Sequence, residues 1–451
     1  MYGGPLVDNK RAEYPSFWRE LPAAQQPIYP DTDALKAVLT DLRSRPPLVF
    51  GGEVDSLRKC MAEAGRGRSF VLMGGDCAES FYDSVESIRR KVQTILQMAA
   101  VLTYGASMPV VKIGRIAGQY AKPRSIDVET RDGVSLPVYR GDSINGYDFT
   151  SEARTPDPSR MLEAYLRAGT TLNIIRAFTT GGYADLRRVH SWNQGFTSNP
   201  AYMRFEDFAD EIDRAMRFME AAGVDFDTLR QVHLYASHEA LQLEYEDSMV
   251  RNDFLSGQRY CASGHLLWIG ERTRSPEHAH VSFLSSVVNP VAVKIGPATS
   301  PLEVSSLIER LNPAGDPGRL TFITRMGSNR IRDVLPRLIE AASVDGRPVT
   351  WIADPMHGNT IVSRGNYKTR RFDAIIDEVR GFFEVHKALG TIPGGIHIEL
   401  TGNDVTEVLG GGAQIGEANL SERYETLVDP RLNHEQSLEM AFEVAEMLRN
   451  E

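Results

Sequence analysis

Eight short apolar runs, rich in β-forming residues, constrain this chain more than any other feature. They cover residues 70–73, 109–113, 232–236, 266–269, 291–295, 321–324, 350–353 and 396–400. Each run ends in glycine or polar residues, and most are followed by a helical pattern, which is typical of repeated βα units. Eight parallel strands can close into a (β/α)8 barrel, although an open doubly wound sheet also buries apolar strands. The number of runs favours the barrel.

The remaining segments suggest additions to that barrel. Residues 1–50 are rich in proline and polar residues and read as an N-terminal extension, with a helix over 32–43 capped by Asp31. Residues 51–451 are expected to form the catalytic barrel. The apolar run 171–178 continues a helical pattern and is assigned to a helix. A final helix is expected over 434–449, with Asn433 as its N-cap.

About fifty residues lie between that internal helix and the third predicted strand. Within them, 184–195 and 203–222 have helical apolar spacing, which predicts an inserted helix pair at about 180–225. A barrel crossover needs only one helix, so the pair is an insertion. Extra packing surface or an oligomer contact is the favoured interpretation, and a regulatory site is the alternative.

Composition excludes several classes of protein. Hydrophobic residues make up 42% of the chain, enough to form a packed core. The net charge of −10 gives no general attraction to nucleic acid or to an anionic membrane. Three scattered cysteines fit a reducing compartment, and neither a secretory leader nor a bilayer-length apolar run is evident. A cytoplasmic location is therefore expected.

Four residues with metal-binding side chains follow strand ends or lie on a nearby loop: Cys77, His357, Glu399 and Asp429. Their wide separation is unlike the paired short spacings of a structural zinc site, so a metal held by them would be catalytic. A thiolate, an imidazole and two carboxylates suit Mn²⁺, Fe²⁺, Co²⁺ or Zn²⁺ better than Mg²⁺. Taken singly, each residue also has an ordinary structural explanation, because a cysteine after a strand is usually just a small buried side chain.

A second constellation is cationic. Strand ends are followed by Arg115, Lys122, Arg124, Arg272, Arg274, Lys294, Arg325 and Lys368. In a barrel these side chains would converge, and guanidinium and ammonium groups bind phosphate and carboxylate oxygens. Glu239 and Glu271 could orient the cations or a water, whereas Trp268 is assigned to packing. The sequence lacks a dinucleotide fingerprint, a Walker A pattern and a serine-hydrolase elbow.

These residues lie in motifs that resemble the type II (plant-like) 3-deoxy-D-arabino-heptulosonate 7-phosphate (DAHP) synthases. The matching motifs are GGDCAESF, KIGRIAGQYAKPRS, YRGDSINGYD, YASHEAL, GHLLWIGERTR, VKIGP, ITRMG, WIADPMHGNT, GIHIELTGNDVTE and RYETLVDPRLNHEQSLEMAF. The resemblance extends from about Trp18 to the C-terminus. It implies a barrel enzyme of the shikimate pathway that condenses phosphoenolpyruvate with erythrose 4-phosphate and releases inorganic phosphate.

The resemblance also implies roles for individual residues. It assigns one divalent metal, with Mn²⁺ or Co²⁺ favoured over Fe²⁺ or Zn²⁺, to Cys77, His357, Glu399 and Asp429. It assigns phosphoenolpyruvate to Arg115, Glu271, Arg272, Lys294 and Arg325, and the aldose phosphate to Lys122, Arg124, Ser125 and Lys368. Of these, Lys294, Glu271 and Arg325 are the expected catalytic residues. Some relatives form a disulfide from the ligand cysteine to a residue just before the last ligand, but Val428 stands there, so that switch is not expected.

Further implications concern partners and alternatives. Relatives with an N-terminal extension and two inserted helices are often oligomeric and inhibited by aromatic amino acids, so we expect a homo-oligomer (dimer or tetramer) and an aromatic effector, with chorismate mutase as a candidate partner. One alternative is an amino-DAHP synthase of secondary metabolism that uses an imino or amino sugar phosphate. Another is a non-catalytic, metabolite-binding regulatory barrel, which would be expected to have lost the four metal-binding side chains.

Overall fold

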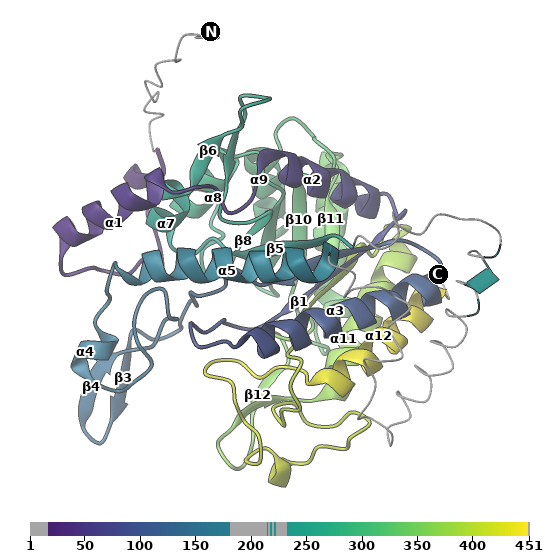
Figure 1. Cartoon of the computed structure of the whole chain (residues 1–451). Helices are drawn as coiled ribbons and strands as arrows, with labels where there is room; N and C mark the ends of the chain where they lie inside the picture. The colour runs from purple at the N-terminus through teal and green to yellow at the C-terminus, as the bar shows by residue number, and fades with distance from the viewer. Residues whose placement is uncertain (1–16, 181–213, 215–216, 219–220, 222–231, 450–451) are drawn as a thin grey trace.

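A closed barrel of eight parallel strands forms the centre of the computed structural model, which describes residues 17–180, 214, 217–218, 221 and 232–449 (Figure 1). In order around the barrel the strands are β1 (Phe70–Gly75), β2 (Val110–Arg115), β5 (Leu234–Glu239), β8 (Leu266–Ile269), β9 (Val291–Ile295), β10 (Leu320–Thr324), β11 (Thr350–Ala353) and β14 (Gly395–Glu399). Pairing of β14 with β1 closes the ring. The predicted (β/α)8 barrel is confirmed, and the open sheet is excluded.

Alternation along the strands decides which side chains enter the barrel, because successive residues of a strand point to opposite faces. Val71, Ile113, Tyr235, Trp268 and Ala292 belong to one buried cluster inside the ring. Residues two positions further along these strands therefore also point inward, at the carboxyl end. That parity explains how charged side chains at strand ends come to line the barrel mouth.

Helix α2 (Gly51–Gly65) closes the opposite end. Its Leu57, Met61 and Ala64 pack into the same interior cluster as the strand residues. The amino end of the barrel is thus filled with apolar side chains, and only the carboxyl end is left for chemistry, as in barrel enzymes generally.

An outer layer of helices covers the strands. It comprises α3 (Val85–Ala106), α5 (Arg160–Thr180), α7 (Leu243–Ser248), α8 (Ala279–Ser285), α9 (Pro301–Leu311), α10 (Ile331–Asp345), α11 (Phe372–Leu389) and α12 (His434–Arg449). Helix α5 confirms that 171–178 is helical. Helix α12 begins directly after Asn433, whose Oδ1 accepts a hydrogen bond from the Gln436 N–H at 2.9 Å. The predicted N-cap is confirmed.

The N-terminal segment packs on this outer layer. Helix η1 (Phe17–Glu20) contains the buried Trp18, whose ring meets Phe283 of α8 edge-on at 6.5 Å. Helix α1 (Thr32–Ser44) is capped by Asp31, which accepts from Asp33 N–H and Ala34 N–H. The division between an extension (1–50) and a barrel (51–451) stays a prediction. The expected helices 184–195 and 203–222 lie almost entirely outside the described residues.

Among the described residues, three hairpins and the short loop helices α4 (Ser151–Arg154) and η3 (Glu417–Asn419) were not predicted. The hairpins are β3 (Val128–Arg131) with β4 (Val134–Pro137), β6 (Val250–Asn252) with β7 (Arg259–Cys261), and β12 (Thr360–Val362) with β13 (Lys368–Arg370). Hairpins β3–β4 and β12–β13 extend from the carboxyl end, whereas β6 lies at the other end (Figure 1). Two of the three hairpins therefore flank the mouth of the barrel.

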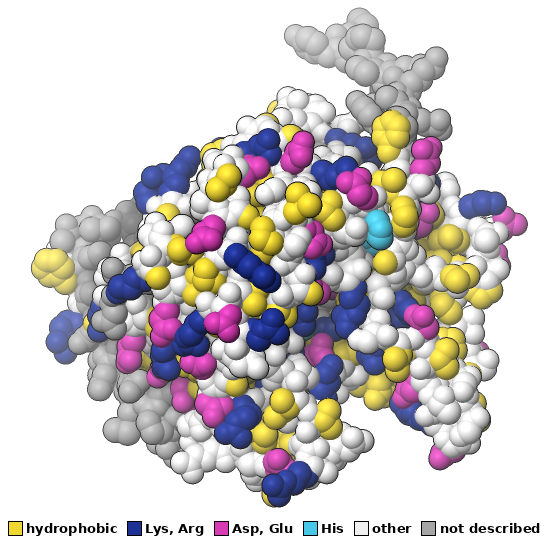
Figure 2. Space-filling view, turned by 180° about the vertical axis from the view of Figure 1, so that it is seen from behind, with side chains coloured by type: hydrophobic (Ala, Val, Ile, Leu, Met, Phe, Trp, Pro, Cys, Tyr) yellow, Lys and Arg dark blue, Asp and Glu magenta, His cyan; other side chains and the backbone are white. Residues whose placement is uncertain are grey.

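The outer surface carries mixed charge. On the face shown in Figure 2, acidic and basic side chains are interspersed and do not gather into a patch of one sign. Across the described ranges, every helix is too short or too polar to span a lipid bilayer.

Candidate active site

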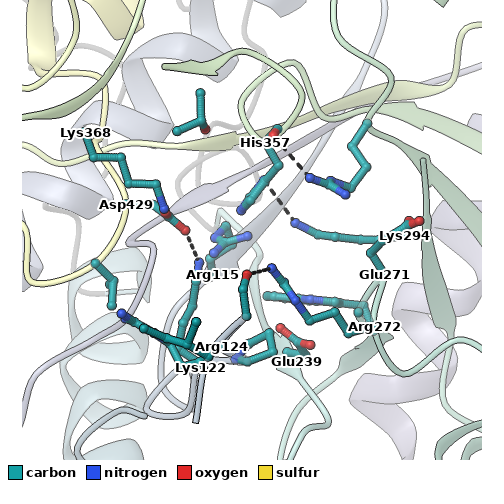
Figure 3. A pocket seen from close by; sticks show the side chains of 18 residues that line it. Arg115, Lys122, Arg124, Glu239, Glu271, Arg272, Lys294, His357, Lys368 and Asp429 are labelled. Carbon is teal, nitrogen blue, oxygen red and sulfur yellow. Dashed lines mark hydrogen bonds and ion pairs between the residues drawn. The ribbon is translucent and has the colours of Figure 1, made fainter. Parts of the chain in front are cut away.

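A cavity of about 400 Å³ opens at the carboxyl ends of the strands (Figure 3). All nine predicted substrate-binding residues line it: Arg115, Lys122, Arg124, Ser125, Glu271, Arg272, Lys294, Arg325 and Lys368. The predicted metal ligands His357 and Asp429 also line it, together with Glu239, Trp268, Thr360 and Val428. The barrel thus brings to one cavity side chains that are more than three hundred residues apart in the sequence.

The other two predicted metal ligands lie just beneath the cavity wall. Cys77 follows β1 and Glu399 ends β14, and the two strands pair with Gly75 opposite Glu399. Donor atoms of Cys77, Glu399 and Asp429 all lie within 4.8 Å of one another, and all three residues are buried. His357 joins them, because its Nε2 is 3.0 Å from Glu399 Oε1. The three clustered donors, with the His357 imidazole next to Glu399, are of the types that bind a divalent ion of the borderline class.

Lys122 compensates the negative charge of this cluster. Its Nζ lies 2.6 Å from Cys77 Sγ, 2.7 Å from Asp429 Oδ2 and 3.4 Å from Glu399 Oε1. Burial opposes ionisation of Asp429, yet the Lys122 charge holds the pKa of that carboxyl well below its usual range. Burial and the adjacent Asp429 and Glu399 raise the pKa of the Cys77 thiol.

Asp354 orients both an expected ligand and an expected catalytic residue. Its Oδ2 lies 2.7 Å from His357 Nδ1 and 2.7 Å from Lys294 Nζ. A carboxylate on one ring nitrogen of a histidine fixes the tautomer and leaves the other nitrogen to bind a metal. Here His357 Nε2 is the nitrogen that faces Glu399. Burial lowers the pKa of Lys294, against the opposing effect of Asp354.

A cationic wall borders the ligand cluster on the barrel side. Arg115 is fully buried and donates to Asp76 O at 2.9 Å and to Glu399 Oε1 at 3.1 Å. Trp268 lies under the wall, with its ring centre 5.1 Å from Arg115 Cζ and 5.9 Å from Lys294 Nζ. Its ring is thus both part of the core and a platform for the two cations.

Two carboxyl groups face the cavity with unused acceptor oxygens. Among the described residues, neither Glu239 Oε1 nor Glu271 Oε2 has a hydrogen-bond partner, although both atoms are buried. Burial raises the pKa of Glu239, and nearby cations only partly offset that effect. Buried acceptors of this kind normally bind a water or a ligand. Glu271 is also 3.2 Å from Arg274, which turns away from the cavity to pair with Glu303.

The outer part of the cavity is formed by loop 122–126, which follows β2. Ser125 Oγ accepts from Arg272 Nη2 at 2.6 Å, and Lys368 of β13 pairs with Asp429. Figure 3 shows Lys122, Arg124 and Arg272 on one side of the cavity and Lys294 and His357 across from them. The cavity therefore has an inner cationic region at the strand ends (Arg115, Lys294 and Arg325) and an outer one on loop 122–126 and hairpin β12–β13 (Lys122, Arg124 and Lys368).

Comparison with known proteins shows the family of this chain. The model of the class-II DAHP synthetase family matches residues 13–445. The chain belongs to the class-II DAHP synthetase family. It is 59% identical over 436 residues to a phospho-2-dehydro-3-deoxyheptonate aldolase of Streptomyces coelicolor, covering 96% of this chain and 97% of that protein. It is 52% identical over 453 residues to the phospho-2-dehydro-3-deoxyheptonate aldolase AroG of Mycolicibacterium smegmatis, covering 99% of this chain and 97% of that protein.

A solved phospho-2-dehydro-3-deoxyheptonate aldolase from Francisella tularensis is 13% identical, with a TM-score of 0.48, and covers 92% of this chain and 96% of that one. That likeness is too remote to add to the description of this class-II DAHP synthetase. The family is established by the two close relatives and by the family model.

Several residues of this class-II site were not singled out in the sequence. Asp354 directly follows the predicted strand 350–353, which is the position where a barrel places functional side chains, so its signal was present. Arg370 had no such signal, because it lies in the unpredicted hairpin β12–β13. Its fully buried guanidinium donates to Glu399 Oε2 at 2.8 Å and also bonds Pro430 O. Metal and substrate roles of the individual side chains remain predictions.

Proposed function

We propose that this chain is a 3-deoxy-D-arabino-heptulosonate 7-phosphate synthase. It joins phosphoenolpyruvate and D-erythrose 4-phosphate, takes up water and releases inorganic phosphate, which is the first step of the shikimate pathway. One observation carries the proposal: in a member of the class-II DAHP synthetase family, a buried cluster of one thiol and two carboxylates, with an imidazole beside it, lies at a cavity lined by cationic side chains.

The family is metal-dependent, and three residues of this chain cluster with donor atoms suited to a divalent ion, with His357 adjacent to one of them. Cys77, His357, Glu399 and Asp429 would hold it, with Mn²⁺ or Co²⁺ favoured and Fe²⁺ or Zn²⁺ as alternatives. When bound, the ion supplies Lewis-acid polarisation of the aldehyde oxygen of erythrose 4-phosphate.

Phosphoenolpyruvate is assigned to the inner cationic region. Arg115, Lys294 and Arg325, with Arg272, would bind its phosphate and carboxylate, and the fixed guanidinium groups would orient C3 toward the aldehyde. Arg325 Nη2 donates to His357 O at 3.1 Å, which couples the anion site to the ligand loop. Arg325 and Lys294 are proposed as catalytic residues because they would offset the charge that develops on the reacting atoms.

Water must add at C2 of phosphoenolpyruvate before phosphate leaves. The unused, buried Oε2 of Glu271 supports a role for this residue in holding that water. The aldose phosphate is assigned to the outer region, where Lys122, Arg124, Ser125 and Lys368 would bind its phosphate group. Cationic charges in both regions would reduce repulsion between the two anionic substrates.

The test is an assay of the purified protein that follows loss of the enolpyruvate absorbance in the presence of erythrose 4-phosphate. We expect activity to vanish after chelation and to return with Mn²⁺ or Co²⁺. Cys77→Ala and His357→Ala should each abolish activity and leave the circular dichroism spectrum unchanged. Absence of turnover with any divalent metal would refute the proposal, and so would full activity of either variant in metal-free buffer.

The amino-DAHP alternative is separated by the same assay with an imino or amino sugar phosphate in place of erythrose 4-phosphate. A higher kcat/KM for the nitrogen-containing substrate would assign the chain to secondary metabolism. The close clustering of Cys77, Glu399 and Asp429 argues against the non-catalytic alternative.

Further proposals concern the assembly and its regulation. We propose a cytoplasmic homo-oligomer, a dimer or tetramer, that is inhibited by an aromatic amino acid and can associate with chorismate mutase. The support is the family together with the N-terminal extension (1–50) and the insertion (about 180–225) in the sequence. Light scattering would give the subunit number, and inhibition assays with each aromatic amino acid would identify an effector.

A further inference from the structure

Loop 122–126 carries three of the predicted substrate residues but has no regular secondary structure of its own. It connects β2 to β3 and presents Lys122, Arg124 and Ser125 to the cavity. A loop of this kind is rigid only if its backbone groups are held by other segments, because loop ordering costs conformational entropy. The contacts that fix this loop therefore matter for substrate binding.

Two segments outside the loop hold its backbone. Lys122 N–H donates to Arg140 O at 2.8 Å, and the Arg140 side chain reaches Asp127 Oδ1 at 2.5 Å. These contacts fix the two ends of the loop. At its centre, Arg124 N–H donates to Gln25 Oε1 at 2.8 Å, and the Ser125 hydroxyl accepts from Arg272 Nη2 at 2.6 Å. Gln25 belongs to the N-terminal segment, about a hundred residues away in the sequence.

Gln25 is itself held in an unusual conformation. Its φ of 64° lies in the left-handed region, which costs a residue other than glycine free energy and persists only where the surroundings enforce it. The neighbouring Gln26 is held separately, because its amide donates to Leu241 O at 2.7 Å and accepts from Leu243 N–H at 3.0 Å. Gln25 is also held by Arg140, whose Nη1 donates to the backbone O of Gln25 at 3.4 Å.

We propose that Gln25 is a positioning residue that fixes loop 122–126 and thereby sets the affinity for the aldose phosphate. The N-terminal segment then completes the active site from outside the barrel. The assignment of this loop to the aldose phosphate rests on the proposed function, but the mechanical role of Gln25 does not. Loss of one such hydrogen bond weakens binding by about fivefold to tenfold.

The experiment uses three matched variants of the full chain. Gln25→Asn keeps a residue that tolerates the left-handed region but shortens the side chain by one methylene, so its oxygen no longer reaches Arg124 N–H. Gln25→Glu keeps an acceptor of full length. Gln26→Asn shortens the adjacent residue, whose side chain bonds Ala24, His280 and the loop after β5 and not loop 122–126.

We expect Gln25→Asn to raise the KM for erythrose 4-phosphate about fivefold to tenfold and to change the KM for phosphoenolpyruvate less than twofold. Gln25→Glu should restore the wild-type value, and Gln26→Asn should stay within twofold of it. Equal increases in both KM values, or the same increase in Gln26→Asn, would show general loosening of the segment and overturn the proposal.

Amide hydrogen exchange separates this proposal from the proposed function. In Gln25→Asn, the peptide covering 122–127 should exchange at least fivefold faster than in wild type, whatever reaction the enzyme catalyses. Unchanged exchange would overturn the role of Gln25. A wild-type protein that fails to turn over its substrates would refute the proposed function alone.

Discussion

Replacing Asp354 with asparagine tests how the inner site is held together. Its carboxylate is fully buried, and its two oxygens serve different partners. Oδ1 accepts from Met356 N–H at 3.0 Å, whereas Oδ2 lies 2.7 Å from Lys294 Nζ. An amide has only one acceptor, so in either orientation its NH₂ group faces one of these donors. The ammonium would also lose its counter-charge.

The expected loss of stability follows from these contacts. Breaking a buried ion pair by removing one partner typically costs about 3–5 kcal/mol, whereas an exposed pair contributes about 0–1 kcal/mol. Asp377→Asn is the matched control, because Asp377 pairs with Arg332 at 3.0 Å on the exposed surface. In urea unfolding of the metal-free proteins, we expect the free energy of unfolding of Asp354→Asn to be at least about 2 kcal/mol lower than that of the control. This is the smallest difference between the two ranges given above.

The same substitution should also weaken metal binding. The orienting bond to His357 Nδ1 is lost, and removal of such a partner typically lowers metal affinity about 10-fold to 100-fold. Titration with Mn²⁺ against a competing chelator measures this directly. If Asp354→Asn matches Asp377→Asn in both stability and Mn²⁺ affinity, the argument that Asp354 organises the site is wrong.

Two further predictions concern other buried groups. Arg370→Lys should weaken Mn²⁺ binding about tenfold or more, because the shorter ammonium cannot bond Glu399 and Pro430 O together; affinity within twofold of wild type would contradict this. Burial lowers the pKa of His386 from 6.5 to about 3. As the pH falls below 6.5, this imidazole becomes protonated in the unfolded chain but stays neutral in the folded protein, so the folded state loses stability. His386→Gln should lack that loss. Its free energy of unfolding in urea, measured relative to wild type, should therefore rise by about 2–3 kcal/mol between pH 7 and pH 4.5. A difference between the two proteins that does not change with pH would contradict this prediction.

The barrel could be predicted from the sequence because its strands are buried on both faces. Such strands appear as apolar runs between polar ends, and all eight predicted runs overlap observed strands. Three strands extend beyond the predicted runs at their carboxyl ends. Strand β2 continues through Gly114 and Arg115, and β5 continues to Glu239, because there the inward positions change from apolar to charged.

The remaining parts of the site depend on contacts that leave no local pattern. Hairpin β12–β13 is short and polar, so neither its strands nor the buried Arg370 could be recognised. Gln25 stands in a proline-rich segment where nothing indicates that its side chain reaches Arg124. Trp268 was assigned to packing, which is correct, but its second role under Arg115 and Lys294 depends on the neighbouring strands.

Closure of the barrel between β1 and β14 has a consequence for how the protein is made. Cys77 is translated more than three hundred residues before Glu399 and Asp429. A nascent chain that has not yet reached Asp429 therefore lacks part of the proposed set of donor atoms. If the proposed ligands are correct, a product terminated before residue 429 would not bind the ion at this site.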